Sequence, residues 1–455
     1  MICRQNKAAV EVKVIERAYI DSKNILGILR RACNYVDPRL MDHGFRVAGI
    51  VWKILEEKGG YRPQEVRDIC FLALLHDVGA YKTDEISRIV QFETEHAEDH
   101  AIYGYLFIRY FSPFTEMAPC ILHHHTPWRT LEHVAEMSAA QKEIAQIIFL
   151  ADRIDIGMAY ERCGWAGCME RVRQMRGYVF KPELADLVLN PGFSVTKEEL
   201  QWEYEGNWTQ LMRQPYTADE INDFTMMLVY TIDFRSRHTV THTITTTSVS
   251  WELAKLLGLD ETYRLQIACG AILHDAGKIG VPVEILEFPG RLSPQAMTVM
   301  RTHVDMTEAI FGGEVDETVT RIALRHHEKL DGSGYPRGLA AGDLTVGERL
   351  VAVADIVSAL TGTRSYKEAY SKERVVRILE DMKQKGLIDG EIVDVFVENY
   401  DLIMSRTQKQ CLPLIEKYQA IQEEFRQMSG EKAREWLKPA RSGPRAAVAA
   451  AHCVP

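Results

Sequence analysis

The distribution of histidine constrains this chain more than any other feature of its sequence. All fifteen histidines except His452 lie in two windows, residues 43–133 and 238–327. Histidines scattered for structural reasons would not leave residues 134–237 and 328–451 without any. Both windows follow one order, which is a single His, a His-Asp pair, another His, a run of two or three His, and then an Asp.

The spacings within the two windows also agree. From the first His to the His-Asp pair, the first window is longer by a single residue. From the third His to the His run, measured to His123 and to His326, the two intervals are equal, and so are the intervals from there to the last Asp. Only the middle segment, between the His-Asp pair and the third His, differs clearly, and it is shorter in the first window. We therefore predict an internal duplication, with two like domains in tandem.

The remaining pattern is helical. Most segments read as amphipathic helices cut by Gly or Pro, such as 46–57 before Gly59 and 249–257 before Gly258, so we expect an all-α fold. A hydrophobic content of 46% excludes general disorder. No stretch reaches the ~20 apolar residues of a membrane helix, and the N-terminus lacks the apolar core of a secretory signal. Nine cysteines without a CxxC pair suggest reduced thiols in a cytoplasmic protein.

The charge balance bears on partners. A formal net charge of −10 repels polyanions, so we expect no binding to DNA or RNA. Because no apolar stretch is long enough for a membrane helix, we also expect no membrane partner. A small phosphate ligand would need cations or metal ions at its own site.

The His and Asp residues of the second window suit a metal centre. Imidazole nitrogens bind transition metals and carboxylates can bridge two of them. Seven ligands exceed the four of a structural zinc site and fit a di-metal centre, which supports phosphodiester hydrolysis. The candidate ligands are His242, His274, Asp275, His303, His326, His327 and Asp355. Any one of them alone would more often be a satisfied core histidine, but the duplicated set favours metal binding.

Two cations follow these ligands. Lys278 lies three residues after Asp275 and could neutralise phosphate charge, and Arg364 lies nine after Asp355 and could bind a second phosphate.

Longer motifs extend the second window. They are His274-Asp275-Ala276-Gly277-Lys278-Ile279-Gly280-Val281-Pro282, His326-His327-Glu328, and Asp331-Gly332-Ser333-Gly334-Tyr335-Pro336. Through these motifs, residues 236–400 resemble an HD-GYP domain, a subclass of the HD superfamily of metal-dependent phosphohydrolases. The resemblance implies an all-helical domain that hydrolyses cyclic-di-GMP to pGpG and often to GMP, with two or three metal ions, commonly iron or manganese.

The resemblance also assigns roles to residues. It implies metal ligation by the seven candidates above, with Asp275 and Lys278 catalytic, and substrate-phosphate contacts for Lys278 and Arg364. The loop with Gly334, Tyr335 and Pro336 would border the substrate cleft, although the residues alone indicate only a tight turn.

Two positions depart from the family pattern. Some members with three metals have Glu four residues before the first His ligand, where this chain has His238, and that residue could ligate a third metal or be a bystander. Family sequences often have Asp three residues after the last Asp ligand, where this chain has Ser358.

The first window resembles an HD domain without the GYP features. Its candidate ligands for a second metal centre are His43, His76, Asp77, His100, His123, His124 and Asp152. Spacing favours His123 and His124 as the pair, whereas Trp128 favours His124 and His125. Ala80 stands where the second window has Lys278, so we expect a regulatory or sensing module, or a hydrolase of different specificity.

The predicted organisation has six parts. They are an N-terminal helical extension (1–35), an HD domain (36–160), a helical connector (161–235), the HD-GYP domain (236–400), a C-terminal helix (401–437) and a flexible tail (438–455). An apolar stripe from Leu414 to Met428 is predicted to pack on its own domain, with a short coiled coil in a homodimer as the alternative.

The functional hypothesis is a cytoplasmic cyclic-di-GMP phosphodiesterase. Hydrolysis of another cyclic dinucleotide, such as cyclic GMP-AMP, or of another nucleotide is the alternative among enzymes. A nucleotide or metal sensor without turnover is the alternative from another class.

Overall fold

The computed structural model describes residues 19–20, 25–36, 38–82, 98–161, 163–196, 216–235, 241–288, 290–362 and 370–429. Within these ranges the chain is helical, and its only β pairings are isolated bridges, so the predicted all-α fold of tandem HD domains is confirmed. Among the described helices, none combines the length and apolar character that a bilayer crossing requires.

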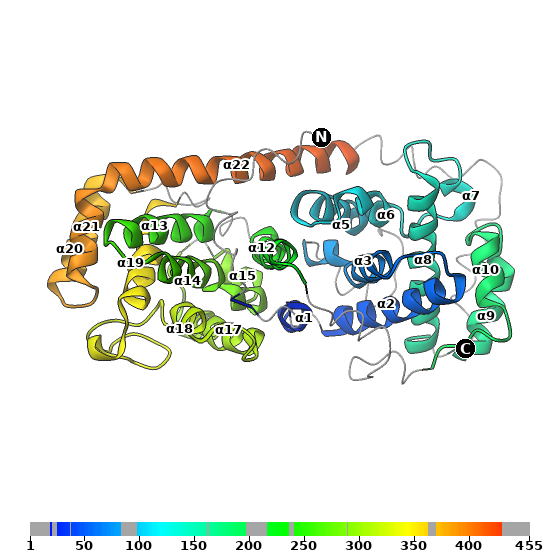
Figure 1. Ribbon diagram of the computed structural model, residues 1–455, viewed down its shortest axis with the longest axis horizontal. Helices are drawn as coiled ribbons and strands as arrows, with labels where there is room; N and C mark the ends of the chain where they lie inside the picture. Colours follow the sequence, from blue (N-terminus) through cyan, green and yellow to red (C-terminus); the bar gives the residue numbers. More distant parts are fainter. Residues whose placement is uncertain are drawn as a thin grey trace.

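The two domains repeat one order of elements (Figure 1). The first has α2 (Pro38–Lys58), α3 (Pro63–Leu74), η1 (Val78–Lys82), α5 (Glu98–Phe111), α6 (Ala118–Leu122) and α8 (Ala139–Ala159). The second has α13 (His242–Leu256), α14 (Glu261–Leu273), η4 (Ala276–Gly280), α17 (His303–Phe311), α18 (Glu317–Leu324) and α19 (Val346–Thr361). The repeated order places corresponding histidines at corresponding points of the two folds.

Local signals in the sequence set the ends of these helices. Gly59 and Gly258 adopt the left-handed φ values of 65° and 69° that end α2 and α13. Ser138 caps α8 and Thr345 caps α19, each with its side-chain oxygen accepting from a backbone N–H in the first turn. These caps begin the two helices that carry Asp152 and Asp355.

Additional helices surround the two domains. Beside the first lie η3 (Thr115–Met117), α7 (Trp128–Leu131), α9 (Gly164–Met175) and α10 (Pro182–Val188). Beside the second lie α15 (Val283–Leu286), α16 (Pro294–Arg301), η5 (Ala341–Asp343), α20 (Lys372–Gln384) and α21 (Gly390–Glu398). Between the domains, α1 (Ile25–Asn34) and α12 (Ala218–Arg235) occupy the centre of the molecule (Figure 1).

The domains are joined by a continuous apolar core. One buried cluster extends from Ile28 on α1 and Phe107 on α5 to Ile272 on α14 and Phe311 on α17, and a second cluster fills the rest of the second domain. Arg31 on α1 also donates to the carbonyls of Ile310 and Phe311. The two domains are therefore held in a fixed relation by buried contacts.

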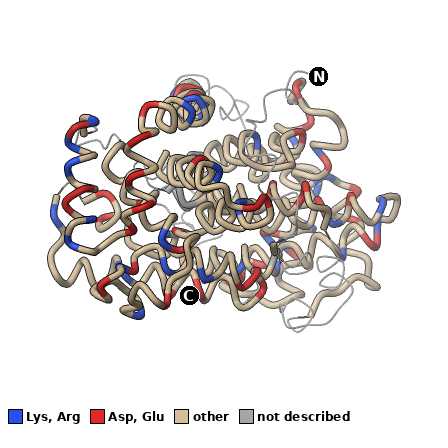
Figure 2. Tube along the Cα trace, turned by 60° about the vertical axis from the view of Figure 1, so that its left-hand side comes forward, with Lys and Arg blue, Asp and Glu red and all other residues tan. Residues whose placement is uncertain are grey.

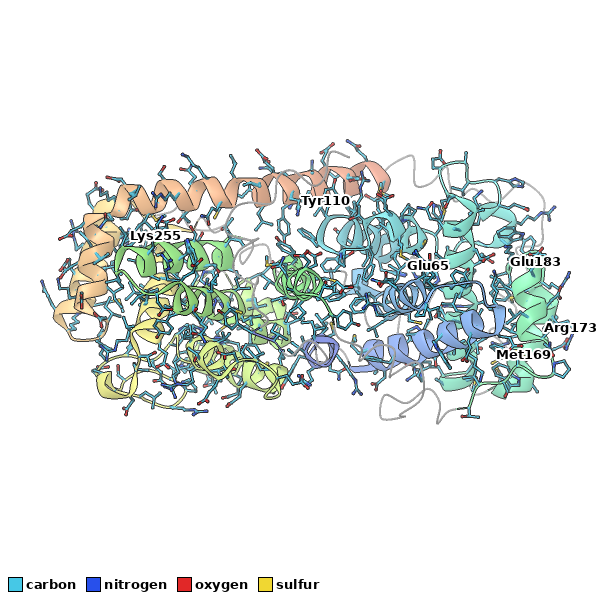
Figure 3. The ribbon with its side chains drawn as sticks, viewed as in Figure 1. Glu65, Tyr110, Met169, Arg173, Glu183 and Lys255 are labelled. Carbon is cyan, nitrogen blue, oxygen red and sulfur yellow. The ribbon has the colours of Figure 1, made fainter. Side chains whose placement is uncertain are left out.

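The C-terminal helix differs from its prediction. Helix α22 (Tyr400–Gln427) begins on the second domain and crosses to the first (Figure 1). The ring of Phe425 stacks on Tyr103 of α5 at a centroid distance of 3.9 Å, and Tyr110 donates to Glu424 at 2.8 Å beneath α22 (Figure 3). The expectation that the stripe packs on its own domain is wrong, because its apolar residues cover the first domain instead. The homodimer stays a prediction.

Candidate metal centres

The second domain gathers its seven candidate ligands from helix ends and one helix interior. His242 and His303 are the first residues of α13 and α17, and the His274-Asp275 pair follows directly on α14. The two remaining histidines follow α18, and Asp355 lies within α19. The ends of α13, α14 and α17 meet beside the middle of α19, so the side chains that these helices carry lie close together.

A close backbone contact fixes the His-Asp turn. A Cβ atom at Gly277 would lie 1.9 Å from the carbonyl oxygen of His303, so only glycine fits between η4 and α17. The backbone N–H of Gly277 donates to Thr307 Oγ1 at 2.8 Å. In the first domain, a Cβ atom at Gly79 would lie 2.0 Å from the carbonyl oxygen of His100. The glycine of this motif therefore sets the separation between the His-Asp pair and the next histidine.

The carboxylate of Asp275 lies between two groups of histidines. Its Oδ2 is 3.3 Å from His242 Nε2 and 3.1 Å from His274 Nε2, whereas its Oδ1 is 3.5 Å from His303 Nε2 and 3.9 Å from His326 Nε2. Two groups of potential ligand atoms, His242-His274-Asp275 and His303-His326-His327, result. A carboxylate shared in this way is the arrangement expected of a bridging ligand between two ions.

Asp355, on α19, also lies between the same two groups of histidines. Its Oδ1 is 3.1 Å from His242 Nε2, and its Oδ2 is 3.6 Å from His327 Nδ1. All seven predicted ligands of the second domain therefore surround one small volume.

Backbone hydrogen bonds fix the tautomers of these histidines. The Nδ1 atoms of His274, His303 and His326 lie 2.6–2.7 Å from the carbonyl oxygens of the residues three positions earlier. A carbonyl oxygen only accepts, so each Nδ1 carries the hydrogen and each neutral ring presents the lone pair of Nε2 to the cluster.

The donor set fits a cation. The Nε2 atoms of His242 and His274 are 3.3 Å apart, and those of His303 and His326 are 3.4 Å apart. Asp275 Oδ1 is buried and has no hydrogen-bond partner within the described residues. Between His303 and His326, two Nε2 lone pairs face each other and the Asp275 carboxylate, which is unfavourable without a positive charge between them, and a metal ion would supply that charge.

Ionisation supports the same conclusion. Burial, which would raise the pKa of Asp275, is outweighed by His274, Lys278 and His242, so that its pKa lies well below the ordinary value. Burial lowers the pKa of His303 to about 4 and that of His327 to about 3, so both rings are neutral at pH 7. Burial opposes charge on His242 as well, but Asp275 and Asp355 raise its pKa to about 9. Ionised carboxylates and mostly neutral imidazoles are the states that bind metal.

The first domain builds a parallel cluster. Asp77 Oδ1 is 3.5 Å from both His100 Nε2 and His124 Nε2, and its Oδ2 is 3.4 Å from His76 Nε2. Asp152 Oδ1 is 3.2 Å from His43 Nε2. The two groups of potential ligand atoms are His43-His76-Asp152 and Asp77-His100-His124-His125.

In the first domain, the structure favours His124 and His125 as the histidine pair, whereas the spacing favoured His123 and His124. His125 Nδ1 is 3.7 Å from Asp152 Oδ2, matching His327 beside Asp355, whereas His123 Nδ1 contacts the hydroxyl of Thr126 at 3.1 Å. The interval from the third His to the pair is one residue longer in the first domain and the interval to the last Asp one residue shorter. These two changes cancel, so the total interval from the third His to the last Asp is the same in both domains. Equal intervals therefore suggested that the pair begins at His123 and not at His124.

The outer partners of the two clusters differ. In the first domain, His43 Nδ1 is 2.7 Å from Asp155 Oδ2, and Arg46 pairs with the other oxygen of Asp155 at 2.6 Å. In the second, His242 Nδ1 is 2.9 Å from Ser358 Oγ, which donates its own hydrogen to the carbonyl of His242 at 3.0 Å. Sequence reasoning noted Ser358 but missed Asp155, although Asp155 stands three residues after Asp152 and so follows the family pattern.

Lys278 and the Gly-Tyr-Pro loop belong to the second cluster alone. Lys278 Nζ is 2.5 Å from Asp275 Oδ2, and the corresponding residue of the first domain is the buried Ala80. The ring of Tyr335 lies 4.6 Å from that of His327, and its backbone N–H donates to the carbonyl of His327 at 3.2 Å. The loop therefore packs directly on a candidate ligand.

A buried carboxylate holds the end of this loop. Glu328 accepts hydrogen bonds from the backbone N–H groups of Arg337, at 2.8 Å, and Leu339, at 3.0 Å. A Cβ atom at Gly334 would lie 2.5 Å from the Cα of Glu328, which requires glycine at that point. Sequence reasoning quoted Glu328 without giving it this role. Two predicted residues, His238 and Arg364, lie outside the described residues.

Comparison with protein families agrees with this geometry. An HD domain model matches residues 40–157, and a second HD domain model matches residues 227–392. Fold, paired clusters and matches together define a protein built from two HD domains. The chain belongs to the HD superfamily as a tandem protein whose second domain is of the HD-GYP type.

Three curated relatives are from Vibrio cholerae and Thermotoga maritima. A 3'3'-cGAMP-specific phosphodiesterase 1 of V. cholerae is 28% identical over 82% of this chain and 90% of its own length. A 3'3'-cGAMP-specific phosphodiesterase 2 of V. cholerae is 35% identical over 38% of this chain and 34% of its own. A cyclic di-GMP phosphodiesterase of T. maritima is 35% identical over 36% of this chain and 46% of its own. Of these three, the first matches nearly the full length of both proteins.

Proposed function

We propose that the second domain hydrolyses a cyclic dinucleotide that contains at least one guanine. The observation that carries this proposal is the pair of histidine groups joined by Asp275 and Asp355, with Lys278 at one side and the Tyr335 loop at the other. Relatives named as cyclic di-GMP and 3'3'-cGAMP phosphodiesterases support the substrate class.

The chain's own residues would divide the work as follows. The seven candidate ligands of the second domain would hold two ions, which supply a Lewis acid for phosphoryl oxygens and lower the pKa of a coordinated water. The Lys278 ammonium, which lies at the cluster in an ion pair with Asp275, would stabilise negative charge on a phosphate bound there. Burial opposes ionisation of both carboxylates, but the neighbouring His242 and, at Asp275, Lys278 outweigh it, so both carboxylates are ionised and able to bind the ions.

The relatives lead to two candidate substrates. Cyclic-di-GMP was expected from the family resemblance. The V. cholerae relative that matches nearly the full length of this chain is named as specific for 3'3'-cGAMP, which favours that nucleotide as the second candidate. Both contain guanine and two phosphodiester groups, so the same metal and cation arrangement serves either one. The product, pGpG or GMP in the first case, depends on whether one or both bonds are cleaved.

We propose a different role for the first domain. Its cluster has a complete set of His and Asp side chains, but Arg153 pairs with Asp152 at 2.7 Å and no lysine stands at the position of Lys278. Because Lys278 also pairs with a ligand carboxylate in the second domain, the features that separate the two sites are the missing lysine and the missing Gly-Tyr-Pro loop. We infer a regulatory or sensing module, or a hydrolase with a different substrate. The native metal, with iron and manganese as candidates, and a third ion at His238 stay predictions.

The test is anaerobic purification followed by metal analysis and a substrate panel. The panel contains cyclic-di-GMP, 3'3'-cGAMP and cyclic-di-AMP, with products separated by chromatography. We expect bound transition metal and hydrolysis of at least one guanine-containing substrate. Tight binding of a nucleotide without any turnover by the metal-loaded protein would favour the sensor alternative instead.

A further inference from the structure

The rim of the second cluster carries an arginine that sequence reasoning did not single out. Arg301 is the last residue of α16 and stands two residues before His303. Its guanidinium carbon lies 4.6 Å from the centroid of the Tyr335 ring, and that ring lies 4.6 Å from the His327 ring. A series of contacts therefore leads from a candidate metal ligand, through one aromatic ring, to a positive charge.

This charge has no counter-ion among the described residues. Several arginines of the domain pair with carboxylates, as Arg325 does with Glu348 and Arg349 with Asp389, whereas others, such as Arg374, do not within the described residues. Arg301 forms no such pair in the described part of the chain, although the protein carries a formal net charge of −10. Figure 2 shows acidic and basic residues interspersed over the helices, so carboxylates are common across the molecule. An unpaired guanidinium beside the cluster is available to an anionic ligand.

The helix dipole alone does not account for the position of Arg301. A cation at the C-terminal end of a helix interacts favourably with the helix dipole, but this would not direct the side chain onto Tyr335. None of the eight residues of α16 is buried, and Met297 and Val299 are exposed. The helix therefore contributes a surface beside the cluster rather than part of the core.

The first domain lacks this pair. Its sequence has Glu98 two residues before His100, where the second domain has Arg301, and Thr126-Pro127-Trp128 replaces the loop of Tyr335. The two domains share their candidate metal ligands but differ in charge at this position. Arg301 therefore belongs with the features in which the two domains differ, not with the ligand set that they share.

The two cations of the second domain contact different parts of the cluster. Lys278 is beside Asp275 Oδ2, the oxygen that faces His242 and His274. Arg301 lies beyond His327, in the other group of histidines. A cyclic dinucleotide has two phosphodiester groups on one ring. When one occupies the cluster, the other must project beyond it.

We propose that Arg301 is a specificity-determining residue that binds the phosphate not undergoing hydrolysis; this inference rests on the proposed function. A guanidinium presents two parallel N–H donors that match two phosphate oxygens. The Tyr335 ring holds the guanidinium plane by cation–π contact before the substrate arrives, so less side-chain entropy is lost on binding. A substrate with a single phosphodiester group would not reach Arg301.

The experiment compares Arg301→Ala and Arg301→Lys with the unchanged protein. The matched control is Arg374→Ala, because Arg374 also lies over a tyrosine ring, that of Tyr370 at 3.8 Å, but on α20. For each protein, KM and kcat are measured with cyclic-di-GMP, 3'3'-cGAMP and bis(p-nitrophenyl) phosphate, which has one phosphodiester group. Binding of both nucleotides is also measured by calorimetry in an Asp275→Asn background, with metal content and Tm recorded throughout.

We expect Arg301→Ala to raise KM and weaken binding by about 10- to 100-fold for both nucleotides, the effect of a lost charge-assisted hydrogen bond. Arg301→Lys falls between, whereas the bis(p-nitrophenyl) phosphate rate, the metal content and the Arg374→Ala protein stay unchanged. Unchanged KM, an equal loss with bis(p-nitrophenyl) phosphate, or an effect on only one nucleotide when the unchanged protein binds both would overturn the inference while the proposed function stands. An unchanged protein that neither binds nor hydrolyses any cyclic dinucleotide would overturn both.

Discussion

The two HD domains of this chain have nearly the same candidate ligands but different surroundings. In both, an aspartate of the His-Asp pair lies between two groups of histidines, and a second aspartate on a long helix meets them from the other side. In the first domain the nearby positive charges, Arg46 and Arg153, pair with Asp155 and Asp152. In the second, Lys278 also pairs with a ligand carboxylate, that of Asp275, but Arg301 forms no ion pair within the described residues.

This difference indicates that the residues for metal binding and the residues for substrate binding form separate sets. The ligand geometry follows from the repeated helix order and from one close glycine contact, which both domains retain. The cations and the loop that would bind phosphate are present in one domain only. We infer that duplication preserved the metal cluster and that divergence at its rim gave the domains separate functions.

The largest effect on activity is expected from removing a candidate metal ligand, and it should differ between the two domains. His274→Ala or Asp275→Ala removes a ligand of the second cluster and is expected to reduce hydrolysis of cyclic dinucleotides by about 10³-fold or more, since several kcal/mol of charge stabilisation are lost. The equivalent change His76→Ala is expected to leave turnover at a measurable level. Product formation over time, with metal content as a second readout, checks both. Complete loss of activity in a folded His76→Ala protein would reverse the roles of the two domains.

Removal of the lysine comes next in size. Lys278→Ala is expected to lower kcat/KM by about 10²-fold, because a charge-assisted contact to phosphate is lost while all seven ligands remain. Lys255→Ala, on the exposed last turn of α13, serves as the control for loss of one lysine charge (Figure 3). Steady-state kinetics on both proteins make the comparison. Equal kinetics for Lys278→Ala and the unchanged protein would remove Lys278 from the site.

The outer partners give a smaller and domain-specific effect. Asp155→Asn removes the charge that supports His43 and is expected to weaken metal binding in the first domain by about 10- to 100-fold. Ser358→Ala removes only a neutral hydrogen bond to His242 and should weaken binding in the second domain by about 10-fold or less. Competition with a chelating dye measures both affinities. A larger effect from Ser358→Ala than from Asp155→Asn would contradict this ranking.

The smallest effect concerns stability and pH. Burial opposes ionisation of Glu143, but Lys181, Lys58 and Tyr61 outweigh it and lower the pKa of Glu143 to about 2. A lowered carboxyl pKa stabilises the folded state above the unfolded pKa, about 4.5, and this contribution is lost as pH falls toward 2. Glu143→Gln is therefore expected to reduce the free energy of unfolding by about 1 kcal/mol or less at pH 7, after allowance for solvent screening. Denaturant unfolding should show the difference between the two proteins shrink from pH 5 to pH 2; a constant difference would contradict the assignment.

Much of the fold and of the second cluster could be predicted from the sequence. The repeat of His and Asp at matched intervals indicated the tandem domains, and all seven residues predicted as ligands in the second domain meet in the structure. Helix ends marked by Gly59 and Gly258 also followed from residue type. These features depend on local spacing and backbone conformation, which the sequence carries directly.

Other features depended on contacts that spacing does not encode. The choice of His125 over His123 required the structure, because the first domain has one residue more before the histidine pair and one residue fewer after it. Helix α22 has an apolar stripe, but its pattern does not say which domain it covers. Arg301 could be recognised only after folding placed it over Tyr335, which belongs to a separate loop much later in the sequence.

The most direct measurement is metal-dependent turnover in reconstituted protein. Metal is removed by chelation, and Fe(II) or Mn(II) is then added anaerobically while bound ions and cyclic dinucleotide hydrolysis are measured in the same sample. We predict that hydrolysis is absent without metal and rises with uptake of two ions by the second domain, an uptake that His274→Ala abolishes. Undiminished hydrolysis by protein shown to be free of metal, or by His274→Ala, would contradict the assignment of the second cluster as the active site.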